Sequence, residues 1–275
     1  MRAVAIIAVH NEERFVDAGL THLFAQGVEA YLINNDSTDG TIDLARRHLG
    51  HGLIGIERLP RGDCFSWRPL LERKQELAAT LPGDWFIHSD MDELRVAPSA
   101  SLTLAQALAQ VDREGYNAVN FFEFMFIPTR ESPDHDHPRF PQTMRWYYPF
   151  LSSPLQQVRA WKRQPAPVNL IEFGGHRVSF PGRKIYPVVF PVRHYQFLSV
   201  PHAIRKYVER RFDPNEVAAG WHKSRAALRV EGIRLPSESE LRPYASDDAL
   251  DASNPRRRHF LFDADWAALQ PRSAS

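Results

Sequence analysis

The feature that most constrains the fold is a run of seven residues at 3–9, AVAIIAV, that is entirely apolar and stops at His10-Asn11-Glu12-Glu13. A short run without polar alternation is typical of a strand buried on both faces of a parallel sheet. No small-residue cleavage site follows it, so we interpret it as a strand and not as a signal peptide. Nowhere do about 20 apolar residues run together, as a membrane span would require. We therefore expect a cytoplasmic protein.

Strand-like and helix-like segments alternate through the first 88 residues. The apolar patterns predict strands at 3–9, 28–33, 53–59 and 85–88, with helices at 11–26, 41–49 and 68–81 between them. Alternation of this kind with short connections favours an α/β fold. The expected architecture is Rossmann-like, with a mostly parallel central sheet flanked by helices.

The second half of the chain has a different pattern. A helix is predicted at 102–111, an aromatic-rich strand at 118–127 and a further strand at 188–196. Segments 140–150 and 155–162 are interpreted as short strands that pair with each other, and helices are expected at 203–212 and 217–230. These strands would form a small antiparallel part. We expect one domain over 1–235, with halves 1–115 and 116–235, followed by a loosely packed tail at 236–275.

Overall charge and cysteine content exclude several classes of function. Lysine and arginine number 34 against 33 acidic residues, a net charge of +1. A chain this close to neutral has no global electrostatic attraction for nucleic acid. The single cysteine, Cys64, excludes an internal disulfide and a cysteine-built zinc site.

Acidic residues follow the predicted strand at 85–88 directly. Asp90 and Asp92 lie two positions apart, so in an extended chain their carboxylates point to one side. Paired carboxylates repel each other unless a proton or cation intervenes, and carboxylate oxygens suit Mg²⁺ or Mn²⁺. The alternative interpretation is a helix N-cap, where acids are equally favoured.

A second polar segment, NNDSTDGT at 34–41, follows the second predicted strand. A polar loop that leads into a helix N-terminus can bind ribose, base or phosphate. The alternative is an Asx turn with a helix cap and no ligand.

Taken together, these motifs resemble the family 2 glycosyltransferases of the GT-A fold, in particular a bacterial subgroup. The matching segments are AIIAVHNEERF at 5–15, YLINNDSTDGT at 31–41 and GDWFIHSDMDE at 83–93. They correspond to the family's opening strand, its acidic loop and its Asp-x-Asp (DxD) metal motif. The resemblance continues more weakly at 119–128, 174–178, 193–199 and 220–225.

The resemblance implies transfer of a sugar from a nucleoside diphosphate donor, with UDP favoured, to a saccharide or lipid-linked acceptor with inversion. Mn²⁺ or Mg²⁺ would bridge the two phosphates. Asp92 would be the main metal ligand, Asp90 would bind the ribose or the metal through water, and His194 would complete the metal site, with His176 as second choice. A lipid-linked acceptor would bring the protein into peripheral contact with the inner face of a membrane.

Several polar and basic residues are candidates for binding the nucleotide sugar. The loop positions are Asn11, Asn35 and Asp36, and Asn35 departs from the carboxylate common in the family. Basic candidates occur on the helix before the metal motif and in the basic segment 201–235, where a solvated helix face remains the alternative. They are Arg73, Lys74, Lys206, Arg210, His222 and Arg225.

Inverting transfer needs a general base, for which a carboxylate is the usual choice. Glu123 lies in the aromatic run FFEFMF, and Glu172 precedes Gly174-Gly175-His176. We favour Glu123, with Glu172 as its rival. Two other functions stay open: a non-catalytic nucleotide-sugar-binding module and another metal-dependent nucleotidyltransferase.

Overall fold

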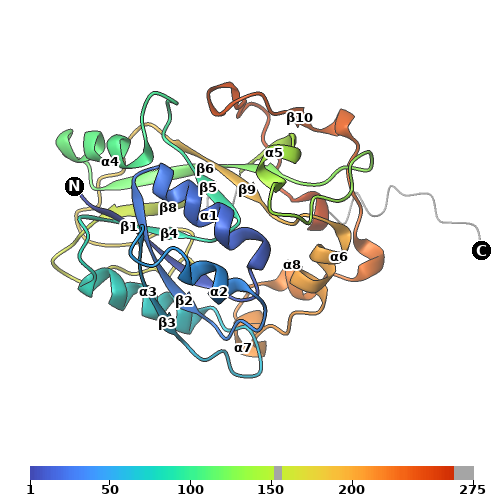
Figure 1. The fold of residues 1–275 in the computed structure, drawn as a ribbon, viewed down its shortest axis with the longest axis horizontal. Coiled ribbons are helices and arrows are strands. Elements are labelled where there is room, and N and C mark those ends of the chain that lie inside the picture. Colours follow the sequence, from blue (N-terminus) through green and yellow to red (C-terminus); the bar gives the residue numbers. More distant parts are fainter. Residues whose placement is uncertain (152–156, 263–275) are drawn as a thin grey trace, which may run out of the picture.

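The computed structural model describes residues 1–151 and 157–262. Its strands form one sheet with the order β10-β7-β6-β8-β4-β1-β2-β3, while β9 pairs with both β5 and β6 (Figure 1). The strands have these bounds: β1 Ala3–Val9, β2 Val28–Asn34, β3 Leu53–Arg58, β4 Trp85–Ser89, β5 Glu93–Arg95, β6 Ala118–Phe126, β7 Trp146–Phe150, β8 Gln157–Lys162, β9 Phe190–Tyr195 and β10 Arg242–Pro243.

The N-terminal half forms the parallel part of the sheet. Strand β1 pairs in parallel with β2 and β4, and β2 pairs in parallel with β3. Ala3, Ala5 and Ile7 of β1 face one hydrophobic cluster, whereas Val4 and Ile6 face the other, because successive side chains point to opposite faces. Both faces are covered, as the apolar run predicts, and the predicted α/β fold class is confirmed.

Helices cover the two faces of the sheet. Apolar side chains of α1 and α4 pack into one cluster, and those of α3 pack into the other. The helices have these bounds: α1 Glu13–Ala25, α2 Thr41–Arg46, α3 Arg68–Thr80, α4 Leu104–Arg113, α5 Phe140–Thr143, α6 Val200–Ala203, α7 Pro214–Ala218 and α8 Lys223–Ala226.

The antiparallel part is built around β6. Strands β8 and β7 pair antiparallel with β6 one after the other along one edge, at Ala118–Phe121 and Glu123–Phe126, and β9 pairs in parallel along the other edge. The prediction that segments 140–150 and 155–162 pair with each other is therefore wrong for the described residues. The long, aromatic β6 is the partner of both, because it is buried on both faces and one of its edges is long enough to take the two strands in succession.

The helices predicted at 203–212 and 217–230 are also wrong in extent. The chain forms α6, a π-helical turn at Ile204–Val208, α7 and α8. Pro214 begins α7, and the positive φ angles of Gly220 (101°) and His222 (58°) interrupt any longer helix. This broken arrangement turns the segment over one end of the sheet.

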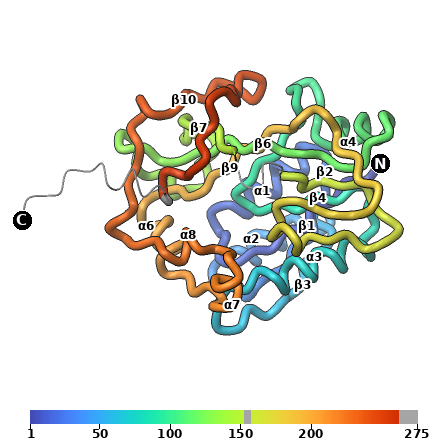
Figure 2. Tube along the Cα trace, turned by 180° about the vertical axis from the view of Figure 1, so that it is seen from behind, coloured from blue at the N-terminus to red at the C-terminus, as the bar shows by residue number. Residues whose placement is uncertain are grey.

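The C-terminal segment is not loosely packed over 236–262, contrary to the expectation. Strand β10 pairs with β7, and Leu241, Phe260 and Leu261 are buried in a hydrophobic cluster with β6 and β7. Figure 2 shows this red part of the tube lying along β7. The apolar residues are few and widely spaced in the sequence, so periodicity gives no signal for them. Residues 263–275 of the predicted tail lie outside the described residues, and the predicted domain boundaries stay predictions.

Among the described residues, no helix combines the length and the apolar character that crossing a membrane requires.

Candidate active site

A cavity of about 610 Å³ lies at the carboxyl ends of β1, β2 and β4. This end of a parallel sheet is where ligands bind in open α/β folds. Residues after β1, β2 and β4 form one wall, and residues of β6, β8, β9 and the segment 204–225 form the other. Of the residues predicted for the site, the cavity wall includes Asn35, Asp90, Asp92, Glu123, Glu172, His194, Lys206 and Arg225.

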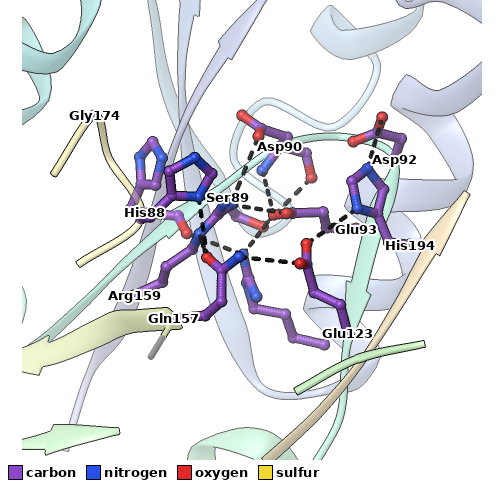
Figure 3. Close-up of polar contacts among 12 residues, drawn as sticks. His88, Ser89, Asp90, Asp92, Glu93, Glu123, Gln157, Arg159, Gly174 and His194 are labelled. Carbon is purple, nitrogen blue, oxygen red and sulfur yellow. Dashed lines mark hydrogen bonds and ion pairs between the residues drawn. The ribbon is translucent and has the colours of Figure 1, made fainter. Parts of the chain in front are cut away.

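A tight turn joins β4 to β5 and carries the acidic motif. The Glu93 amide donates to the Asp90 carbonyl, and the Asp90 amide donates to the Glu93 carboxylate, each at 3.2 Å. Because β5 follows directly, the helix N-cap interpretation of these acids is wrong. The turn directs Asp92 toward His194 and Glu93 toward Arg159, as Figure 3 shows.

Asp92, His194, Glu123 and Lys206 form what we call the cavity cluster. The antiparallel pairing of β5 with β9 sets Glu93 opposite His194, and the parallel pairing of β6 with β9 brings Glu123 alongside. His194 Nε2 lies 3.4 Å from Asp92 Oδ2, and its Nδ1 lies 3.2 Å from Glu123 Oε1. Lys206 Nζ donates to the same Asp92 Oδ2 at 2.6 Å.

The charges of the cavity cluster stabilise one another. Burial alone would raise the pKa of the Asp92 carboxyl, but the charges of Lys206 and His194 outweigh it and lower that pKa. Burial likewise opposes ionisation of Glu123, yet the hydrogen bond and charge of His194 bring its pKa down to about 2. The two carboxylates raise the pKa of His194 well above its usual value despite burial.

Glu93, Arg95 and Arg159 form a second group, which we call the buried arginine cluster. The Glu93 carboxylate pairs with Arg95 and, at 2.7 Å, with Arg159 Nη1, and its side chain is 1% exposed. Arg159 also donates to Gln157 Oε1 at 2.8 Å and to His176 Nδ1 at 3.0 Å. Since an arginine can only donate, Nδ1 of His176 accepts, and its neutral ring carries the proton on Nε2.

The cavity cluster fits a divalent cation. The 3.4 Å between Asp92 Oδ2 and His194 Nε2 is what two ligand atoms show when each lies roughly 2.1 Å from one ion. Glu123 accepts from the other imidazole nitrogen, the support that metal-binding histidines usually have. Ligand atoms of Glu93, Glu123 and His194 also lie within 4.8 Å of one another. Glu93 is already neutralised by two guanidinium groups, so Asp92 and His194 are the better pair.

Three of the basic residues that line the cavity are arginines without a salt bridge to another described residue. Arg61, Arg210 and Arg225 form no ion pair with other described residues, although Arg61 Nη1 donates to Asn35 Oδ1 at 3.2 Å. Burial, followed by the charge of Arg210, lowers the pKa of Arg61 to about 10. Because the charge of Arg210 repels that of Arg61 and both are partly buried, an anionic ligand between them would relieve both repulsion and desolvation.

The polar loop after β2 has both a structural and a cavity-facing part. Asn34 Oδ1 accepts from the Ser37 amide at 2.8 Å, and Asp39 Oδ1 accepts from the Thr41 amide at 3.0 Å ahead of α2. Asn35 lines the cavity, yet its amide nitrogen donates to the Leu59 carbonyl at 3.0 Å. The turn-and-cap interpretation therefore describes most of this loop, and Asn35 is its contribution to the cavity wall.

Four predicted nucleotide-binding residues do not line this cavity. Asp36 pairs with Arg58 at 2.5 Å, and Arg73 pairs with Glu57 at 2.6 Å. Asn11 lies in a neighbouring cavity of about 560 Å³ and accepts from the Thr38 amide at 2.8 Å.

Lys74, the fourth of these residues, is completely buried below the acidic motif that follows β4. Its ammonium donates to His88 Nδ1 at 3.0 Å and to the Ser89 carbonyl at 3.2 Å. Burial lowers its pKa to about 8. In this position Lys74 supports the end of β4.

The two predicted bases have different surroundings. Glu123 uses both carboxylate oxygens, one toward His194 and the other to accept from Gln157 Nε2 at 3.0 Å. Glu172 is exposed at the cavity wall, and its carboxylate makes no hydrogen bond or ion pair within residues 1–151 and 157–262.

Sequence reasoning missed several residues of the site. Arg95 lies between Leu94 and Val96, and Arg159 lies between Val158 and Ala160; a charge between apolar neighbours can signal a buried ion pair. No pattern distinguishes Arg61 from other surface arginines. His259, which stacks on Phe150 with ring centres 3.7 Å apart and lines the cavity, falls in the part expected to be loose.

No family model matches the chain, and no curated protein matches it. Among solved structures, TarS of S. aureus in complex with UDP-GlcNAc is similar at 16% identity and TM-score 0.32, covering 47% of this chain and 35% of that one. A structure of TarS 1-349 has 11% identity and TM-score 0.41, covering 76% and 63%. Another of TarS has 11% identity and TM-score 0.40, covering 84% and 45%. The chain spans between about a third and two thirds of these structures, and at these values the function must be argued from the site itself.

Proposed function

We propose that the protein is a metal-dependent glycosyltransferase that takes a sugar from a nucleoside diphosphate donor. The observation that carries this proposal is the cavity cluster beside three arginines that form no ion pair with another residue of 1–151 or 157–262. Such a site offers a place for a divalent cation and an anion-binding surface at the end of a parallel sheet. UDP is the favoured nucleotide, and a saccharide or lipid-linked molecule is the expected acceptor, both from the sequence resemblance.

In this proposal the arginines and Lys206 bind the diphosphate. Arg61 and Arg210 line the cavity near Asn35, and Arg225 approaches from the segment around α8. As the glycosidic bond breaks, negative charge grows on the departing diphosphate, and fixed cations stabilise it without reorganising. Mn²⁺ or Mg²⁺, held by Asp92 and His194 with Asp90 nearby, would neutralise part of the same charge.

The general base is assigned to Glu172 rather than to Glu123. A base must accept a proton, and Glu123 has both oxygens engaged and a pKa of about 2. Glu123 instead keeps His194 oriented through its Nδ1–H. The free carboxylate of Glu172 lies on the same cavity wall, open to an acceptor hydroxyl. Inversion at the anomeric carbon follows if this base activates the acceptor for direct displacement, and NMR of the product linkage tests it.

The proposal is tested by calorimetric titration of UDP and GDP into the protein with and without Mn²⁺. We expect Mn²⁺-dependent binding of one nucleotide, followed by Mn²⁺-dependent consumption of the corresponding nucleotide sugar. Binding without consumption in the presence of candidate acceptors would favour a binding module. Binding of neither nucleotide by folded protein would overturn the proposal.

A second experiment separates the two carboxylates. Glu172→Gln should lower kcat by about 10²- to 10⁴-fold and leave donor and Mn²⁺ binding unchanged, because only proton removal is lost. Equal kcat values for Glu172→Gln and the unmodified enzyme would exclude Glu172 as the base.

A further inference from the structure

Lys206 occupies a position that a catalytic cation also needs. Its Nζ lies 2.6 Å from Asp92 Oδ2, the same oxygen that faces His194 Nε2. A divalent ion bound by this oxygen and this nitrogen would lie against the ammonium group, and like charges at such a distance repel strongly. The ammonium and the ion therefore compete for one carboxylate.

The surroundings of Lys206 allow it to exchange partners. Its ammonium also donates to the Gln196 carbonyl at 3.0 Å, which accepts from the Tyr207 hydroxyl at 3.1 Å, and it lies 5.3 Å from the ring centre of Phe15 and 5.7 Å from that of Tyr207. Lys206 shares the cavity wall with Arg210, which forms no ion pair with another described residue. A diphosphate bound there would offer Lys206 a new anionic partner, so leaving Asp92 need not expose an unpaired charge.

The buried arginine cluster has no such freedom. Arg159 makes separate bonds to Glu93, Gln157 and His176, with a planar group whose donors are fixed in direction. Lysine carries a single compact charge on a flexible stem. Asp92 is therefore paired with a lysine that can move to another anion, whereas Glu93 is paired with two arginines that are held in place.

We propose that Lys206 is an internal competitor of the metal ion, so that metal and nucleoside diphosphate bind cooperatively. Without nucleotide, the ammonium of Lys206 holds Asp92 and weakens metal binding. The diphosphate draws Lys206 away and frees the Asp92 oxygen. By linkage, the metal raises the affinity for the nucleotide by the same factor. This inference rests on the proposed function, and it assigns Lys206 to the control of metal loading.

The test is Mn²⁺ binding, followed by electron paramagnetic resonance of the free ion, with no turnover required. Lys206→Met should bind Mn²⁺ roughly tenfold more tightly than the unmodified protein in the absence of nucleotide. Adding UDP should raise the Mn²⁺ affinity of the unmodified protein by roughly 5- to 150-fold. Adding UDP should raise the Mn²⁺ affinity of Lys206→Met by a smaller factor.

Arg205→Met is the matched control. Arg205 lies one residue away and pairs with Asp136 at 2.9 Å, outside the main cavity. The substitution removes the same charge without changing a contact of Asp92. The Mn²⁺ affinity of Arg205→Met should therefore equal that of the unmodified protein. An equal gain in both variants would show a general charge effect and overturn the proposal, as would no gain in Lys206→Met.

The same measurements distinguish this inference from the proposed function. If UDP raises the Mn²⁺ affinity of the unmodified protein and of Lys206→Met by the same factor, Lys206 is not a competitor and the proposed function stands. If neither Mn²⁺ nor UDP nor GDP binds to any of the three folded proteins, the proposed function fails, and the inference fails with it.

Discussion

Asp92 and Glu93 are adjacent in the chain, yet the cavity cluster and the buried arginine cluster to which they belong differ in kind. Asp92 faces a lysine and a histidine at the cavity wall, whereas Glu93 faces two arginines and is 1% exposed on its side chain. The two side chains diverge because the turn after β4 directs consecutive residues to opposite sides. The Asp92 carboxylate can therefore exchange one cationic partner for another, whereas the Glu93 carboxylate stabilises the fold.

The difference teaches how a charged site can be held in place. A buried ion pair is costly to break but adds little to stability beyond what an apolar pair would give. Here the buried ion pair has a positioning role. Glu93 and Arg159 hold the turn between β4 and β5 in place, and Asp92 is left at the surface of the cavity. The following predictions test whether this division between support and function is real.

The largest effect is expected for Glu93→Gln. The substitution leaves Arg95 and Arg159 buried without their carboxylate, which should lower the free energy of unfolding by about 3–5 kcal/mol. Chemical denaturation monitored by circular dichroism measures it. Glu172→Gln is the control, since the exposed side chain should change stability by no more than about 0.5 kcal/mol. Similar values for the two variants would show that Glu93 does not support the fold.

Asp92→Asn should have the opposite profile. Replacing the charged oxygen ligand should lower Mn²⁺-dependent consumption of the donor by at least about a hundredfold, because the metal supplies several kcal/mol of charge stabilisation. The free energy of unfolding should change much less than in Glu93→Gln, since Lys206 and His194 retain access to the cavity. Full activity with unchanged Mn²⁺ affinity would remove Asp92 from the metal site.

The contrast also explains what the sequence could predict. Asp90 and Asp92 follow a strand whose apolar run is unmistakable, so local pattern places them at the ligand-binding end of the sheet. The parallel half was predictable for the same reason. Arg61 and Arg159 reach the site only through pairings between distant segments, such as β6 with β8, and no local periodicity encodes those pairings. His194 was predicted as a metal ligand from the family resemblance. Its partner Glu123 was predicted as the general base and not as the residue that orients His194.

Glu123→Gln should have an intermediate effect. Glutamine can still accept from His194 Nδ1–H, but it lacks the charge that favours a well-oriented imidazole. We expect Mn²⁺ affinity to fall by about 10- to 100-fold, with kcat at saturating Mn²⁺ close to that of the unmodified enzyme. A loss of kcat that excess Mn²⁺ does not restore would instead support Glu123 as the general base.

The smallest effect concerns the outer support of the buried arginine cluster. His22 of α1 donates from Nε2 to the Arg95 carbonyl at 2.7 Å, and burial lowers its pKa to about 4. The unfolded chain takes up this proton near pH 6.5 and the folded chain only near pH 4, so stability should fall as pH decreases across that interval. The slope from this one group is at most about 1.4 kcal/mol per pH unit.

His22→Gln isolates that contribution, because glutamine retains an N–H donor for the Arg95 carbonyl and cannot be protonated. Denaturation series between pH 7.5 and 4.5 should show nearly equal stability for the two proteins at pH 7.5. Toward pH 4.5 the loss of stability should be smaller in His22→Gln, because one buried histidine that stays neutral in the folded chain has been removed. Some loss should persist, because other such histidines remain, for example His176 with a pKa of about 4. Parallel curves would mean that His22 is protonated equally in the folded and unfolded chain. In that case the hydrogen bond to the Arg95 carbonyl would be compatible with a charged imidazole, and the pH dependence of stability would come from other groups.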